Sequence, residues 1–145
     1  MRSGSSGLPI SADLLLDTSA AVALVHDQNP AHERILQLTH GRVIGLAGHA
    51  SVEMYSVLTR MPGAARVSPG RAQEIIERSF PASAALSPRS AEAAIATFAD
   101  AGIAGGSVYD GLVGLAARDA AVPLLTCDRR AMGTYAALRV EVLLA

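Results

Sequence analysis

The sequence contains no lysine, and all 12 of its basic residues are arginine. Mechanisms that need a lysine, including the P-loop phosphate site and Schiff-base chemistry, are therefore excluded. Tryptophan is also absent and aromatic residues make up only 3% of the chain, so stacking platforms for single-stranded bases are not expected. The single cysteine, Cys127, cannot form an intramolecular disulfide, which is typical of a protein of the reducing cytoplasm.

Long apolar runs and a large net charge are missing as well. No run approaches the roughly 18 apolar residues of a membrane span, and Asp13 and Asp17 interrupt the N-terminal stretch that most resembles a signal core. The formal net charge of −1 gives no general attraction to nucleic acid, so such binding would depend on where individual arginines lie. We expect a soluble cytoplasmic protein that does not associate with membranes.

The length of 145 residues and the hydrophobic content of 50% suit one domain with a substantial core. Residues 1–7 look like an added leader, and we expect residues 1–11 to be this leader and a flexible N-terminus before a single domain over 12–145. The spacing of apolar residues predicts strands near 14–16, 42–46, 122–126 and 139–144, and helices near 18–26, 30–38, 48–61, 69–79, 88–101 and from 107. This alternation favours a three-layer α/β fold with a mainly parallel central sheet flanked by helices.

Two of the predicted helices carry specific expectations. In the helix over 88–101, the spacing places Ala91, Ile95 and Phe98 on the core side. In the next helix, Ser107 is the expected N-cap. Asp110 shares a face there with small residues at 114 and 117, which would leave space beside its carboxylate.

Four acids fall at positions where chemistry is expected. Asp17 follows the first buried strand, Glu53 lies on the border of a helical apolar stripe, Asp110 begins a helix, and Asp128 follows the strand near 122–126. Loops after parallel strands emerge at one edge of a sheet, so these side chains can converge. Each also has an ordinary structural interpretation: Asp17 and Asp128 as helix caps, Asp110 as part of a capping box, and Glu53 as a surface acid.

Helix capping does not account for several carboxylates gathered in one place, because clustered carboxylates repel and raise one another's pKa. A hard divalent cation would remove this conflict, and Mg²⁺ or Mn²⁺, which prefer oxygen ligands and suit phosphate substrates, are the natural candidates. None of the four histidines is paired with a cysteine at zinc-ligand spacing. The acids therefore predict a Mg²⁺ or Mn²⁺ site.

Four motifs, in this order along the chain, resemble those of PIN domains: Leu-Leu-Asp-Thr-Ser-Ala at 15–20, Ser-Val-Glu-Met at 51–54, Val-Tyr-Asp-Gly-Leu-Val at 108–113 and Leu-Leu-Thr-Cys-Asp-Arg-Arg at 124–130. Within that family the chain most resembles the bacterial VapC-type ribonuclease toxins of type II toxin-antitoxin pairs, over essentially residues 12–145. Gly111, where many relatives carry alanine, departs slightly from the pattern.

The resemblance implies a metal-dependent endoribonuclease in which the four acids Asp17, Glu53, Asp110 and Asp128 are both the catalytic residues and the ligands of Mg²⁺, or of Mn²⁺. Ser19 and Thr126 match hydroxyl positions that support this pocket. Arg129 and Arg130 are weaker candidates for contacts with RNA phosphates. The resemblance further implies a homodimer and a small VapB-like antitoxin whose tail enters the acidic groove.

Three alternative functions compete with this interpretation. A phosphatase of the haloacid-dehalogenase type needs a second acid where this chain has Ser19, and it also needs a lysine, as does a receiver domain. A catalytically silent PIN fold that acts only as a binding module would be favoured if one of the four acids were missing. All four are present, which favours the nuclease.

Overall fold

The computed structural model describes residues 11–145 and contains one four-stranded sheet in which every pairing is parallel. Its strands are β1 (Leu14–Leu16), β2 (Ile44–Leu46), β3 (Leu124–Thr126) and β4 (Val142–Leu144), in the spatial order β2-β1-β3-β4. The predicted leader falls within residues 1–10, which lie outside the described residues. The predicted α/β fold with a parallel central sheet is confirmed.

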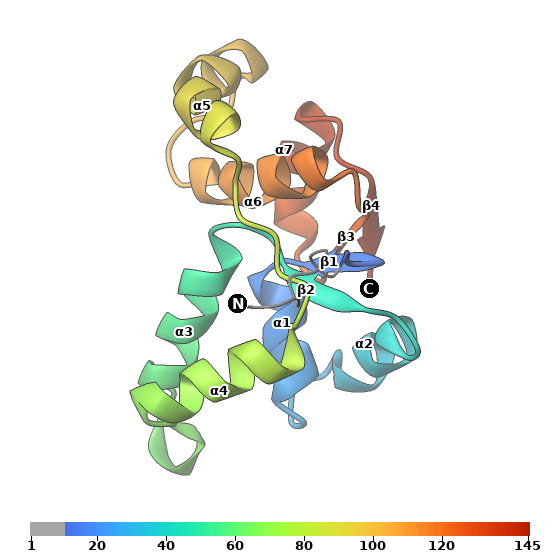
Figure 1. Cartoon of the computed structure of the whole chain (residues 1–145), viewed down its shortest axis with the longest axis vertical. Helices are drawn as coiled ribbons and strands as arrows, with labels where there is room; N and C mark the ends of the chain where they lie inside the picture. Colours follow the sequence, from blue (N-terminus) through green and yellow to red (C-terminus); the bar gives the residue numbers. More distant parts are fainter. Residues whose placement is uncertain (1–10) are drawn as a thin grey trace, which may run out of the picture.

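Helices cover the sheet on both sides. They are α1 (Thr18–Val25), α2 (His32–Thr39), α3 (Ala50–Arg60), α4 (Pro69–Ser79), α5 (Pro88–Ala101), α6 (Ser107–Ala120) and α7 (Met132–Ala137), with 3-10 turns η2 (Gly63–Ala65) and η3 (Arg129–Ala131). Figure 1 shows α1 to α4 on one side of the strands and α5 to α7 on the other. Within residues 11–145, none of these helices is long and apolar enough to span a bilayer.

Burial explains why the strands are mainly apolar. The three leucines of β1 are fully buried because β1 lies between β2 and β3 and is covered by helices on both faces. The predicted Ser-Pro helix starts are also confirmed, since Ser68 and Ser87 accept hydrogen bonds from the first turns of α4 and α5. These local signals therefore locate the starts of α4 and α5.

Three expectations about the helices after residue 88 are wrong. Ile95 is 84% exposed and Ala91 is exposed too, whereas Ala94 and Phe98 are buried, because α5 packs on α6 through a narrow stripe. Ser107 is not the N-cap of α6; Gly106 holds that position, with no side-chain hydrogen bond to the helix. Gly114 leaves no open space, because it is closely packed against side chains of the segment that includes Tyr135.

Candidate active site

The four predicted acids converge on one small cavity of about 140 Å³ beside the carboxyl ends of β1 and β3. Asp17 directly follows β1, and Asp128 follows β3 by two residues. Glu53 comes from the first turn of α3 and Asp110 from the first turn of α6. The cavity is completed by Thr18, Ser19 and Val113.

Asp17 is held by hydrogen bonds to both of its carboxylate oxygens. It is buried, with only 4% of its surface exposed. Its Oδ1 accepts from the Ser19 hydroxyl at 2.6 Å and from the Ala20 backbone N–H at 3.1 Å, and its Oδ2 accepts from the Tyr135 hydroxyl at 2.8 Å. Asp17 is therefore the N-cap of α1 and a cavity residue at once, so the structural and functional interpretations both apply.

Tyr135 was not predicted as a site residue. It is fully buried in α7, and burial together with the neighbouring Asp17 carboxylate raises the pKa of its phenol, so the hydroxyl remains a donor at neutral pH. The ring fits because Gly114 of α6 has no side chain, since an added Cβ would lie 3.2 Å from Tyr135 Cδ1. Gly114 thus accommodates the ring of the residue that orients Asp17.

The two predicted supporting hydroxyls connect the ends of β1 and β3. The Ser19 Oγ accepts from the Cys127 backbone N–H at 2.9 Å and lies 3.3 Å from the Thr126 Oγ1. The Thr126 Oγ1 in turn accepts from the Asp128 backbone N–H at 3.0 Å. Ser19 and Thr126 therefore fix the backbone that carries Cys127 and Asp128 against the start of α1.

Glu53 and Asp128 each have one side-chain partner, half-buried Thr18 and exposed Arg130. Glu53 Oε1 accepts from the Thr18 hydroxyl at 3.1 Å. Asp128 Oδ1 accepts from the Arg130 backbone N–H at 2.9 Å and lies 3.4 Å from Arg130 Nε, whose side chain is 94% exposed. Arg129 is also exposed. A pair this open to solvent contributes little to stability, which leaves the guanidinium of Arg130 available to other anions.

Among the four acids, Asp110 has a clearly shifted pKa. Its pKa is raised to about 6, first by burial and then by the negative charges of Asp17, Asp128 and Glu53, while Arg130 lowers it. Burial and the neighbouring carboxylates thus make ionisation of Asp110 less favourable than that of an isolated aspartate. A cation in the cavity would reverse this effect.

The variant Asp110→Asn is expected to be more stable than the parent protein at pH 7 in EDTA, by about 1 kcal/mol after allowance for solvent screening. The folded state has the higher pKa, so it binds more protons than the unfolded state between about pH 4 and 6, and the stability of the parent falls as the pH rises through this window. Urea unfolding at pH 7 and below pH 4 measures the difference, which should vanish at the lower pH.

The matched control is Asp100→Asn, because Asp100 is an exposed acid of α5 and lies outside the cavity. It should change the unfolding free energy by less than about 0.5 kcal/mol. An Asp110→Asn protein that is less stable than the parent at pH 7 would contradict the proposed repulsion.

The donors of this cavity suit Mg²⁺ or Mn²⁺ in kind and charge, since they are carboxylate and hydroxyl oxygens and the carboxylates repel one another without a cation. Within residues 11–145, however, no three Asp, Glu, His or Cys side chains are already gathered closely enough to hold a metal ion. The carboxylates surround the cavity, with Asp17 fixed and the other three more exposed. The chemistry of the donor set fits a hard cation, while its coordination geometry is not preformed.

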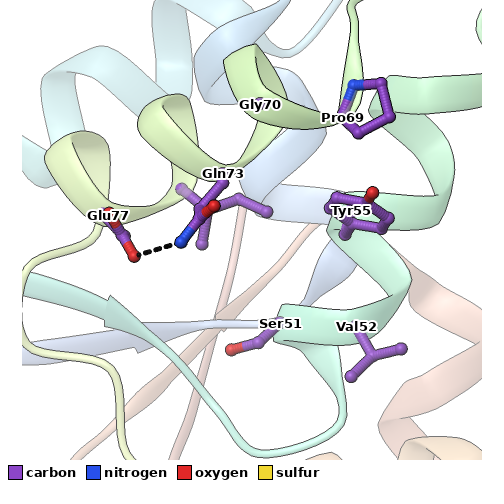
Figure 2. Close-up of a pocket in the computed structure, with 8 residues that line it drawn as sticks. Ser51, Val52, Tyr55, Pro69, Gly70, Gln73 and Glu77 are labelled. Atoms are coloured by element: carbon purple, nitrogen blue, oxygen red, sulfur yellow. Dashed lines mark hydrogen bonds between the residues drawn. The ribbon is translucent and has the colours of Figure 1, made fainter.

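A second, larger cavity of about 410 Å³ contains none of the four acids. It lies between α3 and α4, and Figure 2 shows Tyr55, Val52 and Gln73 around it. Its walls are mostly apolar, and its one interaction between polar side chains is the hydrogen bond from Gln73 Nε2 to Glu77 Oε2 at 3.1 Å. The larger of these two cavities is therefore not the one that the acids line.

Comparisons with known proteins agree with the fold and with the motifs. A family model described as the PIN domain matches residues 14–137. Ribonuclease VapC27 of Mycobacterium tuberculosis (strain ATCC 25618 / H37Rv) is 39% identical over 132 residues, which cover 91% of this chain and 96% of that protein. Ribonuclease VapC40 of Mycobacterium tuberculosis (strain CDC 1551 / Oshkosh) is 39% identical over 130 residues, covering 87% and 94%.

Solved structures share the fold at low sequence identity. FitAcB from Neisseria gonorrhoeae matches with a TM-score of 0.67 and 16% identity, covering 90% of this chain and 96% of that one. VapBC2 from Rickettsia felis, bound to a DNA fragment from their promoter, matches with a TM-score of 0.63 and 12% identity, covering 91% and 98%. At such identities the likeness concerns the fold alone.

Proposed function

Because the chain belongs to the PIN-domain family, and within it to the VapC group, we propose that it is a metal-dependent endoribonuclease that acts as a toxin and is neutralised by a cognate antitoxin. The observation that carries this proposal is the convergence of Asp17, Glu53, Asp110 and Asp128 from four separate elements on one cavity. The relatives named ribonucleases, which align over nearly their whole length, support the same activity.

In the proposed reaction, water hydrolyses an RNA phosphodiester at the acidic cavity. A bound Mg²⁺ or Mn²⁺ would supply positive charge for the phosphate oxygens and lower the pKa of the attacking water. Asp17, Glu53, Asp110 and Asp128 are the residues that would hold it. Asp17 would be the fixed point of the set, because Ser19, Ala20 and Tyr135 restrain both of its oxygens.

Arg130 is the better placed of the two arginines predicted to contact RNA. Its guanidinium lies beside Asp128 and lowers the pKa of Asp110, so its charge reaches the cavity. We assign it to a phosphate next to the cleaved one, where it would offset repulsion between the RNA and the acids. Arg129 is exposed next to it and would have a weaker role of the same kind.

A small VapB-like antitoxin is the proposed protein partner. The solved structures of similar fold include VapBC and FitAB complexes, which supports a partner of this class. An arginine of that partner could form ion pairs with the carboxylates of the cavity. The homodimer implied by the family resemblance stays a prediction.

The test is cleavage of end-labelled total cellular RNA by the purified protein with Mg²⁺, Mn²⁺ or EDTA. Discrete products that need a metal, disappear in EDTA and return when Mg²⁺ or Mn²⁺ is restored are expected, because the clustered acids cannot approach a phosphate without a cation. Equal cleavage in EDTA would contradict metal dependence. An absence of cleavage under every condition would leave the fold as a binding module.

A further inference from the structure

One aromatic pair, with half-buried His49 and exposed Tyr109, lies at the surface between α3 and α6. The rings of His49 and Tyr109 are stacked, with centroids 5.5 Å apart and planes inclined by 27°. Tyr109 is 53% exposed, whereas Phe80, Phe98 and Tyr135 are buried. The pair thus joins two elements that are distant in sequence and presents aromatic surface to solvent.

Helical spacing places this pair next to the acidic cavity. His49 precedes Glu53 by four residues, and the Glu53 backbone N–H donates to the His49 carbonyl at 3.1 Å, so the two residues lie one turn apart. Tyr109 directly precedes Asp110 and is four residues before Val113. Glu53 and Val113 line the cavity, and residues four apart share a helix face, so we infer that the rings of His49 and Tyr109 lie near its rim.

Neither ring makes a side-chain hydrogen bond to the rest of the described residues 11–145. His49 is the N-cap of α3, but its side chain makes no capping hydrogen bond. The hydroxyl of Tyr109 is the donor or acceptor of no hydrogen bond within residues 11–145. An exposed aromatic pair of this kind, beside a cavity for a phosphate, suits the flat face of a nucleobase.

We propose that His49 and Tyr109 form a stacking site for the nucleobase adjoining the cleaved phosphate. This inference rests on the proposed function and adds a determinant of which RNA position is cut. Stacking needs no hydrogen bonds to base edges, and every base has a π face, so the site would favour large purine faces without reading a strict sequence. The low aromatic content excludes a long platform, but a single pair is enough to hold one splayed base.

The first arm of the test measures cleavage by Tyr109→Ala and His49→Ala. Each should lower kcat/KM about tenfold, mainly by raising KM, because stacking on one ring contributes to binding rather than to the chemical step. Tyr109→Phe keeps the ring and should stay within about twofold of the parent. Tyr55→Ala is the matched control, since Tyr55 is a partly exposed tyrosine of α3 that lines the separate apolar cavity.

The second arm measures binding without turnover, by fluorescence anisotropy of a short labelled single-stranded RNA in Mg²⁺, with Asp17→Asn added to every protein so that the RNA is not cut. Tyr109→Ala should weaken binding by a factor similar to its effect on KM. An RNA that lacks the base beside the cleaved phosphate should bind the parent protein more weakly by the same factor. Tyr109→Ala should bind this RNA and the complete RNA equally well. Such non-additivity would identify the base that the pair holds.

The outcomes separate the two proposals. A parent protein that binds RNA through Tyr109 but cleaves none would overturn the nuclease and keep the stacking site. A Tyr109→Ala protein that cleaves and binds like the parent would overturn the stacking site and keep the nuclease. Normal RNA binding with loss of antitoxin binding in Tyr109→Ala would also overturn it and assign the pair to a protein interface.

Discussion

The variant Asp17→Asn is expected to lose more than about 100-fold of the metal-dependent RNA cleavage, because loss of a proposed metal ligand should exceed the roughly 10- to 100-fold cost of losing a partner of a ligand. The amide keeps an oxygen that can accept from Ser19 and Ala20, so α1 should keep its cap. What disappears is the negative charge, together with the oxygen that accepts from the Tyr135 hydroxyl. Cleavage of end-labelled RNA in Mg²⁺ measures the loss, and urea unfolding checks the fold.

Asp13→Asn is the matched control for this variant, because Asp13 and Asp17 flank the same strand, β1, at opposite ends. Asp13 Oδ2 accepts from the Val43 backbone N–H at 2.8 Å, a contact that an amide oxygen can replace. Asp13→Asn should cleave RNA like the parent. Undiminished cleavage by Asp17→Asn would contradict its catalytic role, and equal losses in both variants would point to the fold instead.

The backbone pattern was largely predictable from the sequence because it depends on local signals. Apolar runs bounded by turn residues predicted all four strands, and Ser-Pro pairs predicted the starts of α4 and α5 at the correct residues. Burial was less predictable. Ile95 matches an amphipathic pattern, yet α5 packs mainly on α6, and the stripe of Ala94 and Phe98 is what this contact covers.

Part of the candidate site was predictable because three of its acids, Asp17, Asp110 and Asp128, stand at the ends of predicted strands or helices. Asp17 and Asp128 follow parallel strands that pair with each other, and this alone brings them close. Asp110 and Glu53 were candidates from their positions as well, and the family resemblance added their assignment to one acidic pocket, since a helical position does not reveal which helix end faces the sheet edge. The roles of these residues as ligands stay predictions.

Tyr135 could not have been predicted, because its contact with Asp17 spans 118 residues. A tyrosine in a short helix has no local feature that points to a carboxylate. The one signal was Gly114, a glycine inside a helix, where a close packing partner is a common reason for its presence. The partner itself emerges only when α6 and α7 are packed together.

The variant Gly45→Ala is expected to lose about 3 kcal/mol or more of unfolding free energy, which corresponds to a fall of about 10 °C in Tm. An added Cβ at this position of β2 would overlap backbone atoms of Ala82 and Ser83. The segment over 82–84 runs along β2, with the Ala82 N–H donating to the Ile44 carbonyl at 3.1 Å. Because backbone rather than a flexible side chain blocks the space, the whole segment must move.

The displacement would also break the hydrogen bond from the Leu46 N–H to the Ser83 Oγ, at 2.9 Å, and would shift the start of α5, five residues after Ser83. Gly70→Ala is the control: an added Cβ at Gly70 meets nothing within 4 Å, and alanine favours a helix, so its Tm should be unchanged or slightly higher. Thermal unfolding compares the two. A Gly45→Ala protein as stable as the parent would mean that the 82–84 segment can move away from β2 without lowering the unfolding free energy. The contact between this segment and β2 would then contribute little to stability.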